Sequence, residues 1–399
     1  MGRFGALPTA AITDDSAVGG QIIQGSLIFD DDHNTFFHRD MVGGNRRTWT
    51  ISYWTKLLDV NSTSSQRFWS AGDSGSGDVL KVEYYSGSST RQIGFIDNNH
   101  AGNGIRFTTD AHLQDNAWYH IVMAVDTTVG TAANRVKIYI NGELQTLWSS
   151  GSEHNHPPNQ NYDTAMNKND LGLAFGRAYA FGAGSATHFE GQMSQLYLVD
   201  GQQLEPTSFG FTDELSGVWK PKDYQGTYGQ NGYHLEFRYN PGDSATTLGK
   251  DTSGNGNDWT PVGFSVASDF MTDSVTDSPT NNFCVLNYNG GSGNKPVDGG
   301  LSGSAAGTSA WRHSYGTFPL TRGKWYWEYR FSGSVNGSNG IFMGLYHPDL
   351  TYERDPNSSS TDMYGRQTDT RYSNGTNTAS HFPSFSDGDT VQFAFDADT

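Results

Sequence analysis

The sequence predicts an all-β protein in which two sandwiches of stacked antiparallel sheets follow one another along 399 residues. The first observation is composition: 49 glycines, 20 tyrosines and 23 phenylalanines stand beside only 17% charged residues, which is typical of strands joined by many turns. The second is two-residue alternation of apolar and polar side chains in short runs, separated by clusters of Gly, Ser and Asn. The third is that no long window carries apolar residues at the i, i+3, i+4, i+7 spacing of a helix.

Charge and cysteine content exclude several classes of function. The net charge of −17 argues against binding to nucleic acid, which needs a basic surface. No run approaches the ~18 apolar residues of a membrane span, and the N-terminus has no apolar core of signal-peptide length. Cys284 is the single cysteine, so we expect no internal disulfide and a fold stabilised by packed apolar area.

Residues 1–20 are predicted to be a polar arm with little surface to bury. One interpretation is a frayed terminus. The other is a segment that docks on a partner protein, because ordered arms are common only where something holds them.

The stretch "RRTWTISYWTKLL" opens the first sandwich. Trp49, Ile51 and Tyr53 share one face of an extended chain, which predicts a half-buried strand. "WYHIVMAVD" is apolar on both faces and is therefore expected to be a central strand. "RVKIYINGEL" alternates again, and its Asn141-Gly142 pair supplies the two positive-φ residues of a tight hairpin turn.

A family resemblance rests on two segments of this first half. The first is the Trp-Tyr-His-Ile strand, polar loop and Val-x-Ile-Tyr-Ile-Asn-Gly sequence, and the second is "FEGQMSQLYLVDGQQLEP", in which Met193, Gln195 and Tyr197 alternate with Ser194 and Leu196. Together they resemble the laminin-G/pentraxin-like group of concanavalin A-like jelly rolls over residues 21–212. The resemblance implies a jelly-roll sandwich whose closing strand lies beside its first strand.

Residues 213–284 are predicted to be a connector with one or two strands, packed on a neighbour through Trp219, Trp259 and Phe264. Residues 285–399 are predicted to form a second β module, in which "GKWYWEYRFSG", "NGIFMGLYHP" and "GDTVQFAFDADT" resemble the SPRY fold. In that family the last motif runs into a hairpin. Since the sequence stops at Thr399, we expect this second concanavalin A-like sandwich to be incomplete at its C-terminus, either because the chain is cut or because another subunit supplies the missing strand.

The order of these parts resembles a recurrent class of bacteriophage virion surface proteins: a laminin-G-like sandwich, "VWKPKDY", "DTSGNGNDWTP", "DSPTNNF" and a SPRY-like sandwich. The resemblance implies a tail fibre or tail-associated structural protein on the virion surface. It also implies host attachment through glycan binding, contacts with other virion proteins through the arm, and a homo-oligomer such as a trimer. A capsid-decorating or architectural protein without a ligand is the alternative.

An enzyme is not predicted. Glycosidases built on this jelly roll use paired carboxylates, such as Glu-x-Asp-x-Glu, spaced to flank the scissile bond. The sequence contains no such pair. A polysaccharide hydrolase is therefore only the third candidate.

The candidate glycan site lies on rim loops, since sugars stack on exposed rings beside amide and carboxylate groups and sandwich rims are free to vary. "RAYAFGAGSATHF" and "YDTAMNKND" are the candidate loops, and the first offers Tyr179, Phe181 and His188 as ligand-binding residues. A structural role is the general expectation for any single ring, because most aromatic residues of a sandwich belong to its core.

Calcium is the one cofactor that the sequence suggests. Asp97 and Asn98 in "FIDNNHAGNG" are expected to be loop residues that could hold it at a sandwich rim, as laminin-G and pentraxin domains often do. Asp251 and Asn255 in "DTSGNGND" have the spacing of the first half of a calcium loop, but Val262 stands where that loop places its bidentate acid. The alternatives are a solvated loop for the first pair and a tight Asx/Gly turn for the second.

Overall fold

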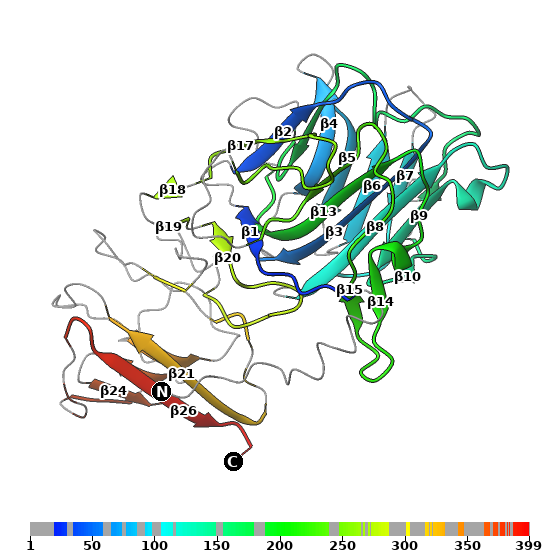
Figure 1. The fold of residues 1–399 in the computed structure, drawn as a ribbon. Helices are drawn as coiled ribbons and strands as arrows, with labels where there is room; N and C mark the ends of the chain where they lie inside the picture. Colours follow the sequence, from blue (N-terminus) through cyan, green and yellow to red (C-terminus); the bar gives the residue numbers. More distant parts are fainter. Residues whose placement is uncertain are drawn as a thin grey trace. The chain divides into compact units, whose positions relative to one another are not determined.

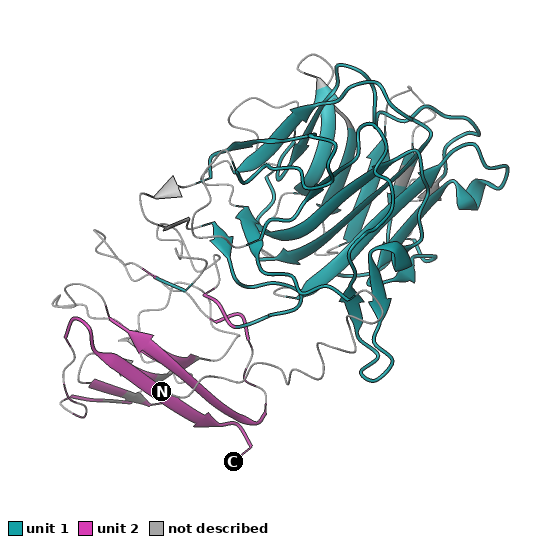
Figure 2. Cartoon of the chain, viewed as in Figure 1, with its two compact units in different colours: residues 1–283, 297–302 teal, residues 284–296, 303–399 magenta. Residues whose placement is uncertain are grey.

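The structure is a computed structural model, and it describes most of the chain. The described residues are 20–29, 35–58, 65–73, 77–85, 92–97, 105–114, 117–148, 155–178, 188–238, 247–264, 266–267, 270–271, 273–286, 301–303, 316–318, 320, 322–331, 342–346, 363–367, 370–373, 376–379, 381, 383 and 386–398. Figure 2 distinguishes two compact units, residues 1–283 with 297–302 and residues 284–296 with 303–399. Nearly all of the predicted N-terminal arm lies outside the described residues.

The first sheet of unit 1 has the strand order β10-β9-β8-β3-β13-β1-β20, with β16 also paired to β13, and all of its pairs are antiparallel. The closing strand β13 pairs with β1, which confirms that feature of the jelly-roll prediction. The strands are β1 (Ser26–Phe29), β3 (Thr48–Leu57), β8 (Trp118–Asp126), β9 (Val136–Ile140), β10 (Glu143–Leu144), β13 (Gly191–Asp200), β16 (Tyr233–Leu235) and β20 (Ser274–Val275).

The second sheet stacks on the first to complete the sandwich (Figure 1), with the order β11-β7-β6-β5-β4-β12-β2-β17. Its strands are β2 (Phe36–Asp40), β4 (Gln66–Asp73), β5 (Gly77–Tyr85), β6 (Gln92–Asp97), β7 (Ile105–Thr108), β11 (Asn155–His156), β12 (Gly172–Phe175) and β17 (Thr260–Val262). In the described part of the chain, the 3-10 turns η1 (Ala132–Asn134) and η2 (Pro206–Ser208) are the only helical segments. No described helix has the length and apolar character to cross a membrane. The all-β prediction is confirmed.

The core lies between these two sheets and follows the predicted alternation of β3. Trp49, Ile51 and Tyr53 are fully buried in the main apolar cluster. The Trp49 ring meets the rings of Trp69 and Phe95 edge-on, with centroids 6.4 and 6.1 Å apart. Such pairs stabilise a core beyond the area they bury.

The predicted hairpin is also confirmed. Asn141 and Gly142 have φ of 50° and 82°, and the strands that they join, β9 and β10, pair from Ile140 to Glu143. In β13, however, a bulge at Gln195 (φ 52°) breaks the predicted alternation. Met193 and Leu196 both enter the core as a result, because one extra residue reverses the facing of the side chains that follow.

The predicted connector packs on the outer face of the first sheet. Its hairpin of β14 (Gly210–Thr212) and β15 (Trp219–Pro221) presents Trp219, whose Nε1 donates a hydrogen bond to Nδ1 of His120 over 2.9 Å. His120 lies in a stack between the rings of Trp54 and Trp219, and its Nε2 donates to Ser52 Oγ at 2.8 Å. The connector therefore belongs to the same compact unit as the sandwich. It covers apolar side chains on the outer face of the first sheet, which would otherwise be exposed to water.

Two other connector aromatics, Trp259 and Phe264, belong to the main core. Trp259 packs against Phe175 at 4.9 Å and Phe264 against Phe37 at 4.8 Å between ring centroids. Short strands β18 (Val266–Ala267) and β19 (Phe270–Met271) follow. Packing through all three predicted aromatics is thus confirmed.

We expect two buried histidines to make unit 1 acid-sensitive. Burial lowers the pKa of His120 to about 3 and that of His234 to about 4, from 6.5. Below about pH 6.5 these histidines bind protons in the unfolded chain but stay neutral in the folded chain. The free energy of unfolding is therefore unaffected by them above about pH 6.5 and decreases as the pH falls below it. Urea unfolding should therefore show stability falling by about 1.4 kcal/mol per pH unit for each histidine. A free energy of unfolding that is constant between about pH 6.5 and 5 would contradict this.

Unit 2 contains two sheets in its described part, β21-β26 and β22-β23-β24-β25. Along β21 the residues alternate between exposed and half-buried as predicted, and Trp327 stacks on Phe393 at 5.3 Å. β26 pairs with β21 over all of its residues, and among the described residues this sheet consists of these two strands. The strands are β21 (Lys324–Arg330), β22 (Phe342–Tyr346), β23 (Met363–Gln367), β24 (Thr370–Ser373), β25 (Thr376–Thr378) and β26 (Thr390–Asp396).

Candidate functional site

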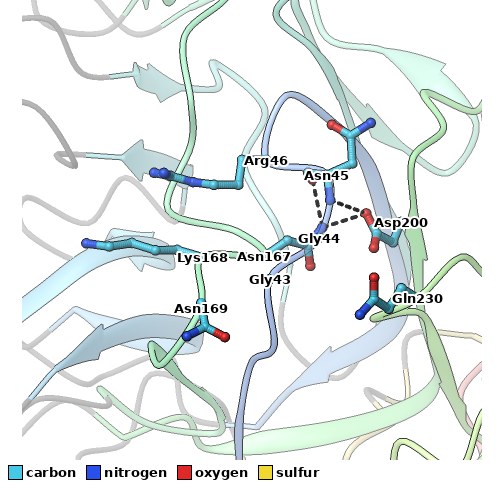
Figure 3. A pocket seen from close by; sticks show the side chains of 9 residues that line it. All are labelled: Gly43, Gly44, Asn45, Arg46, Asn167, Lys168, Asn169, Asp200 and Gln230. Atoms are coloured by element: carbon cyan, nitrogen blue, oxygen red, sulfur yellow. Dashed lines mark hydrogen bonds between the residues drawn. The ribbon is translucent and has the colours of Figure 1, made fainter.

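A polar depression of about 740 Å³ lies where four segments of unit 1 meet. These are the loop between β2 and β3, the loop before β12, the end of β13 and the segment around Gln230 (Figure 3). The lining residues are Gly43, Gly44, Asn45, Arg46, Asn167, Lys168, Asn169, Asp200 and Gln230. The loop before β12 is the predicted rim loop "YDTAMNKND".

Asp200 is the hub that holds these segments together. Its Oδ1 accepts hydrogen bonds from the backbone N–H of Asn45 at 3.0 Å and from Nδ2 of Asn167 at 2.9 Å. Its Oδ2 accepts the N–H of Asn231 at 3.2 Å. One buried carboxylate at the end of β13 thus links three loops that are far apart in sequence, as Figure 3 shows for Asn45 and Asn167.

Burial is the main influence on the titration of this carboxyl. It raises the pKa of Asp200 above the ordinary value of 3.8, while the N–H groups of Asn231 and Asn45 oppose the rise by stabilising the anion.

Gly44 is required for the close approach of these loops. A Cβ at this position would lie 2.6 Å from Oδ2 of Asp200 and 2.3 Å from Nδ2 of Asn231. Both atoms belong to buried side chains, so neither can move aside without breaking a hydrogen bond. The glycines of the Gly-Gly-Asn sequence at 43–45 therefore mark a close approach of the backbone to other segments, and they could have indicated this site from the sequence.

The loop before β12 is fixed from beneath by the core. Trp49 Nε1 donates to Thr164 Oγ1 at 3.0 Å, and that hydroxyl donates to the carbonyl of Arg46 at 2.6 Å. The guanidinium of Arg46 in turn donates to the backbone carbonyls of Thr164 and Asp163. Arg46 and Lys168 extend away from Asp200 in Figure 3.

Asp97 is a second anchor of the same loop, and the structure corrects its predicted setting. It is the fully buried last residue of β6 and not a loop acid. Its oxygens accept hydrogen bonds from the hydroxyl of Tyr162 at 3.0 Å and the N–H of Ala165 at 2.8 Å. Its neighbour Asn98 lies outside the described residues.

Asp251 and Asn255 form a tight polar turn, as in the alternative interpretation of their motif. The buried Asp251 carboxylate accepts N–H groups of His234, Ser253 and Asn257 at 2.8–2.9 Å. Asn255 donates from Nδ2 to the carbonyls of Gly229 and Gly232, so this turn braces the segment that carries Gln230. In the described part of the chain, no three His, Cys, Asp or Glu residues gather as metal ligands do.

The predicted ligand-binding residues are only partly described. Tyr179 and Phe181 lie outside the described residues. His188 is half-buried and forms an isolated antiparallel bridge with Arg177, and it is not among the residues that line the depression.

The family comparison agrees with the fold. Residues 30–205 match the laminin G-type family model that is described as the concanavalin A-like lectin/glucanases superfamily. The first unit is accordingly a concanavalin A-like jelly-roll sandwich. A search of curated proteins found no match.

Similar solved structures include a heptameric SAP-like pentraxin from Limulus polyphemus, at 14% identity and a TM-score of 0.33 over 47% of this chain and 81% of that one. A putative carbohydrate binding protein from Bacteroides ovatus has 17% identity and a TM-score of 0.39, with coverage of 61% and 58%. Tailspike protein 2 of Escherichia coli O157:H7 bacteriophage CAB120 has 15% identity and a TM-score of 0.33, with coverage of 49% and 24%. At these identities the likeness concerns the fold alone.

Proposed function

We propose that this protein binds glycans through the depression around Asp200 and serves as a surface structural protein of a bacteriophage virion. The observation that carries the binding function is the lining itself: amide, carboxylate, ammonium and backbone groups of four segments converge on one open hollow. Hydroxyl-rich ligands need such a mixture of donors and acceptors, held rigidly by packing behind them. The match of residues 30–205 to a lectin/glucanase family supports the same proposal.

The lining favours binding over hydrolysis. Glycosidases use two carboxyl groups, roughly 5–9.5 Å apart, on opposite sides of the scissile bond. Asp200 is the one carboxyl group that lines this depression. Its oxygens accept three N–H donors. The residues that line the depression therefore include no second acid that could form a catalytic pair with it.

The virion part of the proposal rests on the order of modules in the sequence. A laminin-G-like sandwich followed by "VWKPKDY", "DTSGNGNDWTP" and a SPRY-like module is typical of phage surface proteins. On such a particle the sandwich would face outward as a fibre or tail-associated component, and its oligomerisation would multiply weak sugar contacts. A capsid-decorating role without a ligand is the competing proposal.

A glycan array tests the binding site. We expect the combined substitutions Lys168→Ala and Asn169→Ala to weaken glycan binding by about tenfold or more, since each removes a polar contact from the rim. Both residues are solvent-accessible, so the melting temperature should be unchanged. Asn134→Ala, an exposed amide in η1 outside the depression, is the matched control.

Two results would oppose the proposal. Wild-type protein that binds no glycan, while electron microscopy locates it on the particle, would favour the architectural role. Glycan binding that is unchanged by the double substitution would show that the glycan binds elsewhere on the molecule.

A further inference from the structure

A second hollow of about 340 Å³ lies in unit 1, where the connector meets the first residues that the structure describes. Its lining includes Gln21, Asp223, Tyr224, Tyr228, His234 and Glu236. It shares no lining residue with the depression around Asp200. The proposed glycan site therefore does not account for it.

The bulge of β13 gathers the wall of this hollow. Oε1 of Gln195 accepts hydrogen bonds from Nε2 of Gln21 at 3.1 Å and from Nε2 of His234 at 2.8 Å. The hydroxyl of Tyr197 donates to the same oxygen at 3.0 Å and lies 3.4 Å from Oδ1 of Asp223. Three lining residues from separate segments are thus held around one amide, and bulges commonly redirect side chains beside functional sites.

The amide groups direct their donors at the protein itself. Nε2 of Gln195 donates to the carbonyl of Glu236 at 3.3 Å, so its oxygen is the atom that faces Gln21. Nε2 of Gln21 therefore donates to Gln195, and Oε1 of Gln21 is left buried without a partner among the described residues. Nε2 of Gln225 likewise donates to Oδ2 of Asp223. The wall thus favours a ligand that supplies hydrogen-bond donors.

The hollow is also negatively charged. Asp223 and Glu236 line it, and no lysine or arginine does. Among the described residues the Asp223 carboxylate contacts only neutral donors, and Oε2 of Glu236 lies 3.5 Å from Nε of the exposed Arg238. His234 is neutral, because burial lowers its pKa to about 4. Burial, and after it the charge of Asp223, raises the pKa of Tyr228 above its ordinary value of 10.

We propose that this hollow binds a primary ammonium group, either of a free polyamine or of a lysine side chain on a partner protein. An ammonium group has three N–H donors and no acceptor, which matches the two carboxylates of the lining. The rings of Tyr224 and Tyr228 add attraction for a cation placed over their faces. In the described part of the chain the acids and His234 are not gathered as metal ligands are, so an organic cation fits better than a metal ion.

Calorimetric titration of the full chain with cadaverine, an alkyl diamine, is the test. We expect saturable binding that weakens severalfold when NaCl is raised from about 0.02 to 0.2 M, because salt screens partly exposed charges. Two probes serve as controls. Pentanediol has the same length without charge, and tetramethylammonium has the charge without an N–H donor. Both should bind at least about tenfold more weakly than cadaverine.

Substitution of the two acids tests the residues. Glu236→Gln and Asp223→Asn should each weaken cadaverine binding by about tenfold, because each removes a charge-assisted hydrogen bond. Among the described residues the Glu236 carboxylate contacts only the exposed Arg238, so Glu236→Gln should fold even where Asp223→Asn does not. Glu214→Gln makes the same charge change at an exposed residue between β14 and β15, outside the lining, and should bind as the wild type does.

The proposal is overturned if the wild type does not bind cadaverine, if pentanediol binds equally well, or if Glu236→Gln binds with unchanged affinity. A peptide with an internal lysine, titrated beside the same peptide with glutamine in its place, distinguishes the two sources. Binding of the lysine peptide identifies a side chain of a partner, whereas binding of cadaverine alone identifies a free polyamine. Since no glycan is present, these results are independent of the array experiment.

Discussion

Replacing Trp49 with alanine is expected to lower the free energy of unfolding by about 3–5 kcal/mol. Trp49 is fully buried, meets Trp69 and Phe95 edge-on, and donates its indole N–H to Thr164. Its removal leaves a large cavity between the sheets and frees the loop that carries Asn167. Urea unfolding monitored by circular dichroism measures the loss, and glycan binding should weaken in parallel.

Trp49→Phe separates the two roles of this side chain. It keeps an aromatic ring in the core but leaves Thr164 Oγ1 without its donor. We expect a smaller loss of roughly 1–3 kcal/mol, with the pocket loop affected more than the sheets. A loss below about 1 kcal/mol for Trp49→Ala would contradict the central packing of this residue.

The second large effect is expected at a buried ion pair. Nζ of Lys56 lies 2.8 Å from Oδ2 of Asp277, and both side chains are fully buried. The pair fastens the segment around β20 to the outer face of β3. Lys56→Ala or Asp277→Ala should each cost about 3–5 kcal/mol, because each leaves the other charge buried and unpaired.

A double-mutant cycle identifies the cause. Substituting both residues together should cost clearly less than the sum of the single substitutions, since no lone charge then remains. Lys250→Ala, which breaks the exposed pair with Asp258, is the control and should change stability little. Additive single effects at Lys56 and Asp277 would show that the pair is not coupled.

Local patterns were sufficient for much of the fold. Alternation in "TWTISYW" predicted the core face of β3, Asn141-Gly142 predicted the hairpin, and a family resemblance predicted the return of β13 beside β1. The segment of residues 162–170, part of which lines the proposed site, was one of the two candidate rim loops.

Long-range contacts were not accessible to such patterns. Asp97 stands before a polar run and so resembled a loop acid, yet Tyr162 and Ala165 bury it. No local pattern indicates the role of Asp200, because its partner Asn45 lies 155 positions earlier in the sequence. The bulge at Gln195 and the folding of the connector onto the first sheet likewise depend on tertiary packing, which overrides local periodicity.

The most direct test of the account is a crystal structure of the protein with an oligosaccharide selected on the array. We expect the sugar to lie in the depression, in contact with Asn169 and Lys168 and close to Asp200. Sugar bound instead on the face of the second sheet, or on unit 2, would contradict the assignment of this site.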